Sequence, residues 1–99
     1  MAITVICTYT LKDASRQDFI ELLSRHWSTL NRHGLVSGEP SRLMAGHDDD
    51  AQNQIVEIFD WKSRDASAAA HQLPDVLAIW EPMGQLCESM DFRHFTALA

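Results

Sequence analysis

The feature that most constrains the fold is a segment whose two faces are both apolar. Residues 54–61 read Gln-Ile-Val-Glu-Ile-Phe-Asp-Trp, and their β-branched and aromatic content predicts a strand. Successive side chains of a strand point to opposite faces, so Val56 and Ile58 share one face. The apolar residues of the other face are Ile55, Phe59 and Trp61. Such a strand is expected at the centre of a sheet, covered on both sides.

The segments before this strand predict a strand, a helix and a second strand. Residues 2–11 alternate and are rich in β-branched residues, which is typical of a strand. A helix of about five turns follows, in which Ser15 and Asp18 form a capping box and Gly34 supplies the left-handed residue after the last turn. Residues 41–47 predict a weakly patterned strand at an edge of the sheet.

Between these segments, residues 37–40 predict a turn and residues 48–53 predict a polar hairpin loop. The strand that opens at residue 54 is expected to run to residue 62.

The C-terminal part predicts two helices and a last strand. A short helix is expected over 63–71 with Ser63 as its cap, and a longer one over 74–90, where Pro74 suits the first helical position. The ring of Pro82 clashes with the preceding turn, which predicts a break or kink just before it. Residues 91–98 predict the closing strand.

The predicted order is β-α-β-β-α-β, which indicates an α+β, ferredoxin-like sandwich with a four-stranded antiparallel sheet and one domain over residues 1–99. The first and third strands are expected at its centre. Two helices cover only one face, so a bare face with Ile6, Phe59 and Trp61 would be a large apolar patch. We therefore expect a homodimer, sheet against sheet, that forms a dimeric α/β barrel.

Composition excludes several partners. The 99 residues carry a formal net charge of −6, which argues against nucleic acid and anionic membranes. No apolar stretch approaches the length of about 20 residues that a membrane span needs. The start of the chain has no basic region typical of a signal peptide. Cys7 and Cys87 lack metal-ligand spacing and are interpreted as buried thiols of a cytoplasmic protein, with no metal site expected.

Two functions that use this fold are excluded by missing motifs. The strand at 54–61 lacks the glycine and aromatic spacing of an RNA-recognition motif, and it carries two acids. The segment after the first strand, Leu11-Lys12-Asp13-Ala14, offers no Cys-x-x-Cys loop for copper.

The run from the third strand into the second helical region carries a family resemblance. Trp61-Lys62-Ser63-Arg64-Asp65-Ala66 is followed by Ala70-His71, and then by Pro74 and Trp80. In this pattern the chain resembles the dimeric α+β barrels that include the antibiotic-biosynthesis monooxygenases. The resemblance covers about residues 2–98. The resemblance implies a cofactor-free oxygenase, a heme-degrading enzyme or an isomerase. The first strand carries no asparagine, so the Asn, Trp and His set of the heme-degrading branch is absent, and we expect no cofactor.

His71 and Glu57 are the candidate catalytic residues. The His71 imidazole can take a proton from a phenol or enol at neutral pH; the alternative is that it caps carbonyls at a helix end. Glu57 interrupts an apolar strand face, where a carboxylate must be paired or protonated. Its alternative role is an ion pair between subunits with Arg42 or Arg93.

Apolar and aromatic residues are the candidates for substrate binding. They are Trp80, Trp27, Trp61, Met83 and His26. Trp80 lies beside the expected break and is the strongest of them, whereas core packing is the alternative role of Trp27, Trp61 and His26.

The sequence therefore predicts a homodimer with a small apolar pocket between helices and sheet near His71 and Trp80. The leading hypothesis is a cofactor-independent monooxygenase, or a related proton-transfer enzyme, that acts on an aromatic or polyketide-like small molecule. The competing hypothesis is a non-catalytic small-molecule-binding or structural homodimer. An enclosed space of roughly 300 Å³ or more that touches His71 or Glu57 would favour the enzyme.

Overall fold

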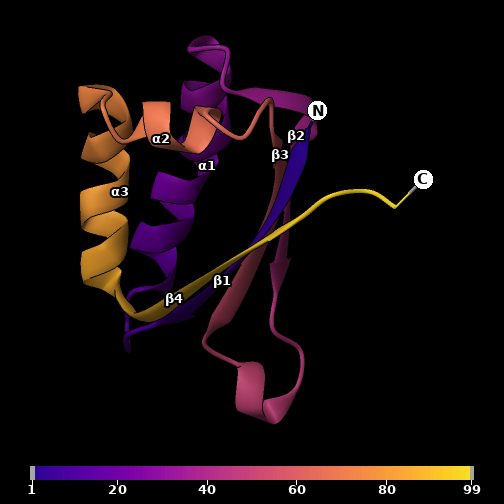
Figure 1. Ribbon diagram of the computed structural model, residues 1–99. Helices are drawn as coiled ribbons and strands as arrows, with labels where there is room; N and C mark the ends of the chain where they lie inside the picture. Colours follow the sequence, from indigo (N-terminus) through magenta and orange to yellow (C-terminus); the bar gives the residue numbers. More distant parts are fainter. Residues whose placement is uncertain (1, 99) are drawn as a thin grey trace.

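A computed structural model describes residues 2–98. Its elements confirm the predicted β-α-β-β-α-β order (Figure 1). They are β1 (Ile3–Leu11), α1 (Arg16–Arg32), β2 (Val36–Ala45), a 3-10 turn η1 (Asp49–Ala51), β3 (Gln54–Trp61), α2 (Ala66–Ala70), α3 (Pro74–Leu86) and β4 (Cys87–Phe95). Among the residues described, no helix has the length and apolar character needed to cross a membrane.

The four strands form one antiparallel sheet in the order β2-β3-β1-β4, so β1 and β3 occupy the centre as predicted. In the register of the central pair, Cys7 lies opposite Glu57 and Val5 lies opposite Phe59. The helices lie together on one face of the sheet, and the other face carries no helix (Figure 1). α1 and α3 also pack against each other.

The buried core lies between the sheet and the helices, and it corrects the predicted assignment of faces. Every second residue of β3 is buried, which places Phe59 and Trp61 on the face that the helices cover. The prediction that these two aromatic side chains lie on the bare face is therefore wrong. Because side chains of a strand alternate, the open face carries Ile6, as predicted, together with Val56 and Ile58, and all three are half-buried.

The ends of α1 were predicted in part. Gly34 has a φ of +71°, which confirms the left-handed residue after the helix. The predicted capping box is wrong, because the Ser15 side chain makes no cap hydrogen bond and its backbone is already helical. The Ser15 hydroxyl lies 3.5 Å from the carbonyl of Asp13 instead.

The second strand is longer than predicted. β2 starts at Val36 rather than residue 41, and the expected turn at 37–40 is an irregular part of the strand. Ser37 pairs with Asp60 and Arg42 pairs with Ile58, so the β2 side of this interval holds three extra residues, which bulge out of the ladder. β2 is an edge strand, as predicted.

Of the predicted break or kink at Pro82, the break is wrong, because α3 continues through Pro82 as one helix. Val76, Ile79 and Met83 lie before and after the proline and are buried against the core, so packing holds the helix on both sides of the missing amide. α3 nevertheless ends at Leu86 rather than near residue 90.

The element boundaries around α3 differ from the prediction as well. β4 begins at Cys87, because Cys87 and Ser89 already pair with β1. The short helix α2 starts at Ala66 with Asp65 as its N-cap residue, so Ser63 does not cap it.

Candidate functional site

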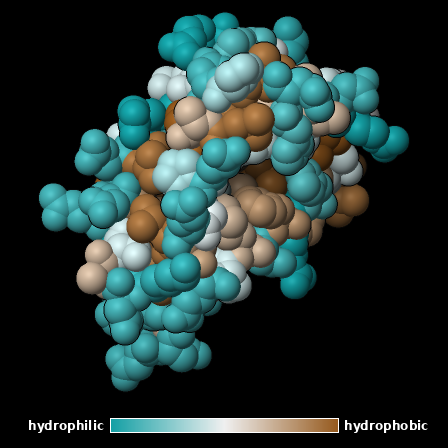
Figure 2. Space-filling model, turned by 90° about the vertical axis from the view of Figure 1, so that its left-hand side faces the viewer, coloured by the Kyte–Doolittle hydropathy of each residue, from teal (hydrophilic) through white to brown (hydrophobic). Residues whose placement is uncertain are grey.

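A cavity of about 400 Å³ lies between the helices and the sheet. Side chains of β1, α1, β3, α2, α3 and β4, together with His71 at the end of α2, line it, and most of them are apolar or aromatic. Figure 2 shows the helix-bearing side of the molecule, where apolar side chains appear between the polar ones. The volume of the cavity exceeds the roughly 300 Å³ expected of an enzyme pocket, and the cavity touches His71, but it is partly open to solvent rather than enclosed as expected.

Five of the predicted site residues line this cavity. They are His26, Trp61, His71, Trp80 and Met83. Glu57 does not line it but contacts His26, which does. Trp27 does not line it either; it packs half-buried against the core, where its indole nitrogen has no hydrogen-bond partner among the described residues.

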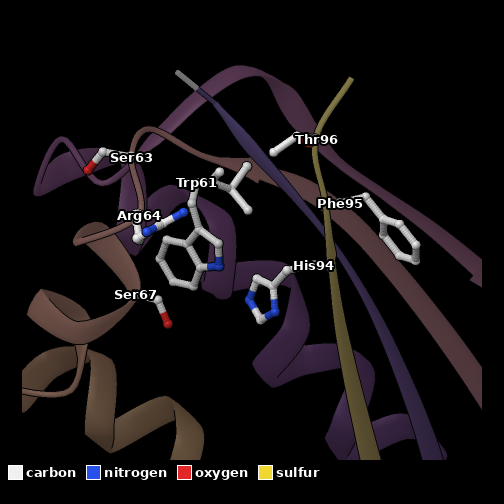
Figure 3. A pocket seen from close by; sticks show the side chains of 8 residues that line it. Trp61, Ser63, Arg64, Ser67, His94, Phe95 and Thr96 are labelled. Carbon is white, nitrogen blue, oxygen red and sulfur yellow. The ribbon is translucent and has the colours of Figure 1, made fainter. Parts of the chain in front are cut away.

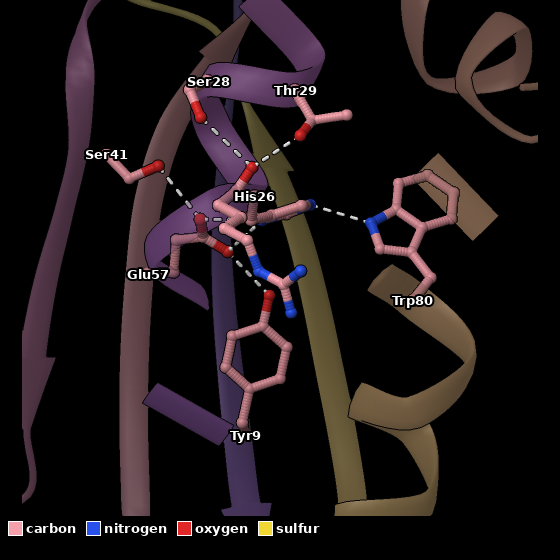
Figure 4. A network of polar contacts seen from close by, with 8 residues as sticks. Tyr9, His26, Ser28, Thr29, Ser41, Glu57 and Trp80 are labelled. Carbon is pink, nitrogen blue, oxygen red and sulfur yellow. Dashed lines mark hydrogen bonds and ion pairs between the residues drawn. The ribbon is translucent and has the colours of Figure 1, made fainter. Parts of the chain in front are cut away.

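Glu57 is fully buried and accepts hydrogen bonds from three side chains (Figure 4). The Tyr9 hydroxyl donates to its Oε1 at 2.7 Å, and the Ser41 hydroxyl donates to its Oε2 at 2.9 Å. His26 Nδ1 lies 3.0 Å from Oε1 and 2.9 Å from Oε2. An isolated buried carboxylate is strongly unfavourable, whereas each hydrogen bond to a charged group is worth about 1.5–3 kcal/mol, so these donors make the burial possible.

Trp80 fixes the protonation of His26. The indole Nε1 of Trp80 lies 2.8 Å from His26 Nε2. An indole nitrogen only donates, so Nε2 accepts and carries no proton. The proton of a neutral imidazole is then on Nδ1, which donates to Glu57. His26 is thus a neutral imidazole held in one orientation between a carboxylate and an indole, and Glu57 is the charged partner.

Among the residues described, Glu57 does not pair with Arg42 or Arg93, the two arginines considered for an ion pair between subunits. Arg42 lies opposite Ile58, and Arg93 lies opposite Ile6, so both arginines belong to the open face of the sheet. Glu57 is the neighbour of Ile58 in the chain, and adjacent side chains of a strand point to opposite faces, so Glu57 points to the covered face.

The buried anion changes the acidity of its neighbours. Burial and the negative charge of Glu57 raise the pKa of Tyr9 far above its ordinary value. Burial, followed by the charge of Glu57, raises the pKa of the Cys7 thiol to about 12. At neutral pH both groups are therefore protonated, and neither supplies a nucleophile.

His71 follows the last turn of α2 and is exposed. Its ring centroid lies 4.7 Å from that of Trp80, at an interplanar angle of 63°. Within residues 2–98 no hydrogen bond engages the imidazole, so the predicted alternative of a side chain that caps helix carbonyls is not what the structure contains. A ring that faces a cavity with both nitrogens available can exchange a proton with a bound molecule.

Two further residues of the site, Tyr9 and His94, were not predicted from the sequence. Cys7 lies opposite Glu57, and Tyr9 lies two positions further along β1, on the same face. Because side chains of a strand alternate, this spacing could have predicted that Tyr9 lies near Glu57. His94 lines the cavity from β4, opposite Val5 on the covered face. Its face could not be assigned from the sequence, because Phe92 and Phe95 place one aromatic side chain on each face of this strand.

The described residues contain no group of three or more His, Cys, Asp or Glu side chains placed to hold a metal ion. The functional groups of the site are imidazoles and one buried carboxylate, beside an apolar cavity. This set can bind a small apolar molecule and move a proton to or from it.

No protein-family model and no curated protein matches the chain. Solved structures do. SnoaB, a cofactor-independent oxygenase from Streptomyces nogalater, is 22% identical over 99% of this chain and 94% of that chain, with a TM-score of 0.73. Rv0793 from Mycobacterium tuberculosis is 16% identical over 100% of this chain and 97% of that chain, with a TM-score of 0.79.

A third solved structure is described as a candidate antibiotic biosynthesis monooxygenase from Nitrosomonas europaea. It is 14% identical over 98% of this chain and 90% of that chain, with a TM-score of 0.78. At such identities the likeness concerns the fold. The chain therefore has the α+β fold of the solved structures named antibiotic biosynthesis monooxygenases, as the sequence resemblance predicted.

Proposed function

We propose that the protein is a cofactor-independent monooxygenase, or a related proton-transfer enzyme, that acts on an aromatic or polyketide-like small molecule. The observation that carries the proposal is the cavity of about 400 Å³ with an unengaged imidazole, His71, in its wall. The shared fold with SnoaB, described as a cofactor-independent oxygenase, supports the oxygenase class.

His71 is the base in this proposal, because its ring lines the cavity and has both nitrogens available. It removes a proton from the acidic carbon or hydroxyl of an anthrone-like substrate. Trp61, Trp80 and Met83 supply the apolar surface for a flat ring system. Glu57 acts through His26 as a positioning residue, since its carboxylate holds the His26 ring that lines the same cavity.

The oxidant is molecular oxygen. The deprotonated substrate carbon gives its electron pair to O₂, and a carbon–oxygen bond forms in a peroxide. The peroxide takes up the proton held by His71. Loss of the second hydrogen from the same carbon, with cleavage of the oxygen–oxygen bond, yields a carbonyl group and one water molecule. The substrate methylene is oxidised by four electrons, and O₂ is fully reduced.

We also propose that the chain forms a homodimer through the open face of its sheet. Ile6, Val56 and Ile58 make this face apolar at its centre, and Met44 and Phe95 are exposed at 40% and 49%. A second copy placed by two-fold symmetry would cover this surface. The buried thiols of Cys7 and Cys87 fit a reducing compartment such as the cytoplasm.

Oxidation of anthrone to anthraquinone, followed by oxygen uptake, tests the proposed enzyme. His71→Ala should lower the rate by about 100-fold or more, because a positioned base contributes that much, and should leave the folded state intact. His47→Ala is the matched control, because His47 is fully exposed in a loop outside the cavity. Equal rates of the His71 variant and the wild type would remove His71 from the mechanism. Anthrone binding by the wild type without oxygen uptake would favour the non-catalytic small-molecule-binding homodimer.

A further inference from the structure

A second hollow, of about 300 Å³, adjoins the cavity at the end of the sheet where β3 passes into α2 (Figure 3). Trp61, Ser67 and His94 line both hollows, so they are neighbours around shared side chains. The residues that line only the second hollow include Arg64 and Ser63. We call this second hollow the Arg64 groove.

The fold brings these side chains together from three elements. Trp61 ends β3 opposite Ile3, and His94 of β4 lies opposite Val5, so both point to the covered face on either side of β1. Arg64 follows Trp61 by three residues, in the connection that leads to α2. Figure 3 shows Trp61, Arg64 and His94 around one space, with the indole nitrogen of Trp61 turned toward His94.

The indole N–H of Trp61 is a buried donor that no described residue satisfies. Trp61 is only 5% exposed, and its Nε1 has no hydrogen-bond partner within residues 2–98. An indole nitrogen cannot accept, so only an incoming acceptor atom can satisfy it. Leaving such a donor unpaired is unfavourable, and Trp61 lines the groove, so an acceptor that enters the groove beside the indole ring could pair with it.

The charge of the groove points to the kind of acceptor. The described lining residues include no Asp or Glu, although the chain as a whole carries a formal net charge of −6. Arg64 supplies one fixed positive charge, and no carboxylate of the described residues lies within ion-pair distance of it. One guanidinium with neighbouring hydroxyl and N–H donors matches a single carboxylate, which arginine binds with two parallel hydrogen bonds.

We propose that the Arg64 groove is a carboxylate subsite, and that the ligand of the neighbouring cavity is an aromatic acid. Its ring system occupies the apolar cavity, and its carboxylate lies in the groove between the Arg64 guanidinium and the indole N–H of Trp61. The subsite narrows the proposed function from an aromatic molecule to an aromatic carboxylate. The subsite depends on the proposed function only for the aromatic part of the ligand.

Binding of a matched pair of probes tests the subsite. The probes are 2-naphthoate and its neutral analogue 2-naphthamide, and titration calorimetry measures their affinities for the full chain. The wild type should bind the naphthoate at least tenfold more tightly. Arg64→Gln should weaken naphthoate binding about tenfold and leave naphthamide binding unchanged. Arg25→Gln removes the same charge from an exposed position on α1 outside both hollows, and it should change neither affinity.

The indole proton of Trp61 gives a second readout that does not depend on the arginine variant. In proton NMR spectra this resonance, identified by its loss in Trp61→Phe, should move downfield when naphthoate is added and forms the missing hydrogen bond. Equal affinities of the wild type for the two probes, an unchanged naphthoate affinity in Arg64→Gln, or no naphthoate binding at all would each overturn the subsite.

The two proposals fail separately. Arg64-dependent naphthoate binding in a protein that does not consume oxygen keeps the subsite and removes the oxygenase. Oxygen uptake with anthrone, together with equal affinities for naphthoate and naphthamide, keeps the oxygenase and removes the subsite.

Discussion

The hydrogen bond from Tyr9 to Glu57 provides the sharpest test of the buried network. Tyr9→Phe removes a donor at 2.7 Å from a fully buried carboxylate and keeps the ring in the core. Hydrogen bonds to charged groups contribute about 1.5–3 kcal/mol, and water cannot replace the lost donor at this depth, so we expect a loss of about 2 kcal/mol. For a chain of this length that loss lowers Tm by about 10 °C, as thermal unfolding followed by circular dichroism would show.

The matched control is a hydrogen bond of similar length in a more accessible place. The Ser24 hydroxyl donates to the carbonyl oxygen of Glu21 at 2.6 Å on α1, where both residues are exposed. Water can reach this carbonyl when the donor is lost, so Ser24→Ala should cost less than about 1 kcal/mol. If the two variants lowered Tm equally, or if Tyr9→Phe left Tm unchanged, the account of Glu57 as an anion that depends on its donors would be refuted.

The same residue predicts how stability depends on alkaline pH. The folded state raises the pKa of Tyr9 above its ordinary value of 10.0, through burial and the charge of Glu57. The stabilisation is therefore complete below pH 10 and declines as the pH rises beyond it, because the unfolded chain loses the phenol proton first. Tyr9 is the only tyrosine of the chain, so the near-ultraviolet absorbance of tyrosinate should appear only when the protein unfolds. Tyrosinate absorbance in the folded protein would contradict this.

Two further predictions concern the open face and the thiols. Light scattering should give a mass of twice 11.2 kDa for the wild type and the mass of a single chain for Ile58→Lys. The control Ile20→Lys, at an exposed site on α1, should stay dimeric. A monomeric wild type would contradict the proposed interface. Iodoacetamide should label Cys7 and Cys87 slowly in the folded protein and fully in denaturant, because both are buried and the pKa of Cys7 is raised to about 12; rapid labelling of Cys7 in the folded protein would show that it is accessible.

Local patterns in the sequence were sufficient for the element order and the sheet centre. Alternation over residues 2–11 and 54–61 identified β1 and β3, and the helical spacing up to Gly34 identified α1, because these periodicities depend on neighbours in the chain alone. They were also sufficient to single out Glu57 as anomalous, since it is an acid in an otherwise apolar strand face. The candidates His71, Trp80 and Met83 likewise lie around one cavity in the structure.

Only the tertiary structure decided which face of the sheet is covered and which partners the buried groups have. A period of two assigns Phe59 and Trp61 to one face, but the packing of α1 and α3 decides that this face is the inner one. Likewise, no local rule connects Glu57 with His26 and Tyr9, which lie 31 and 48 positions away along the chain. Contacts at such separations form only when the whole sheet and its helices are in place, so the proton on His26 and the shape of the cavity are properties of the folded chain.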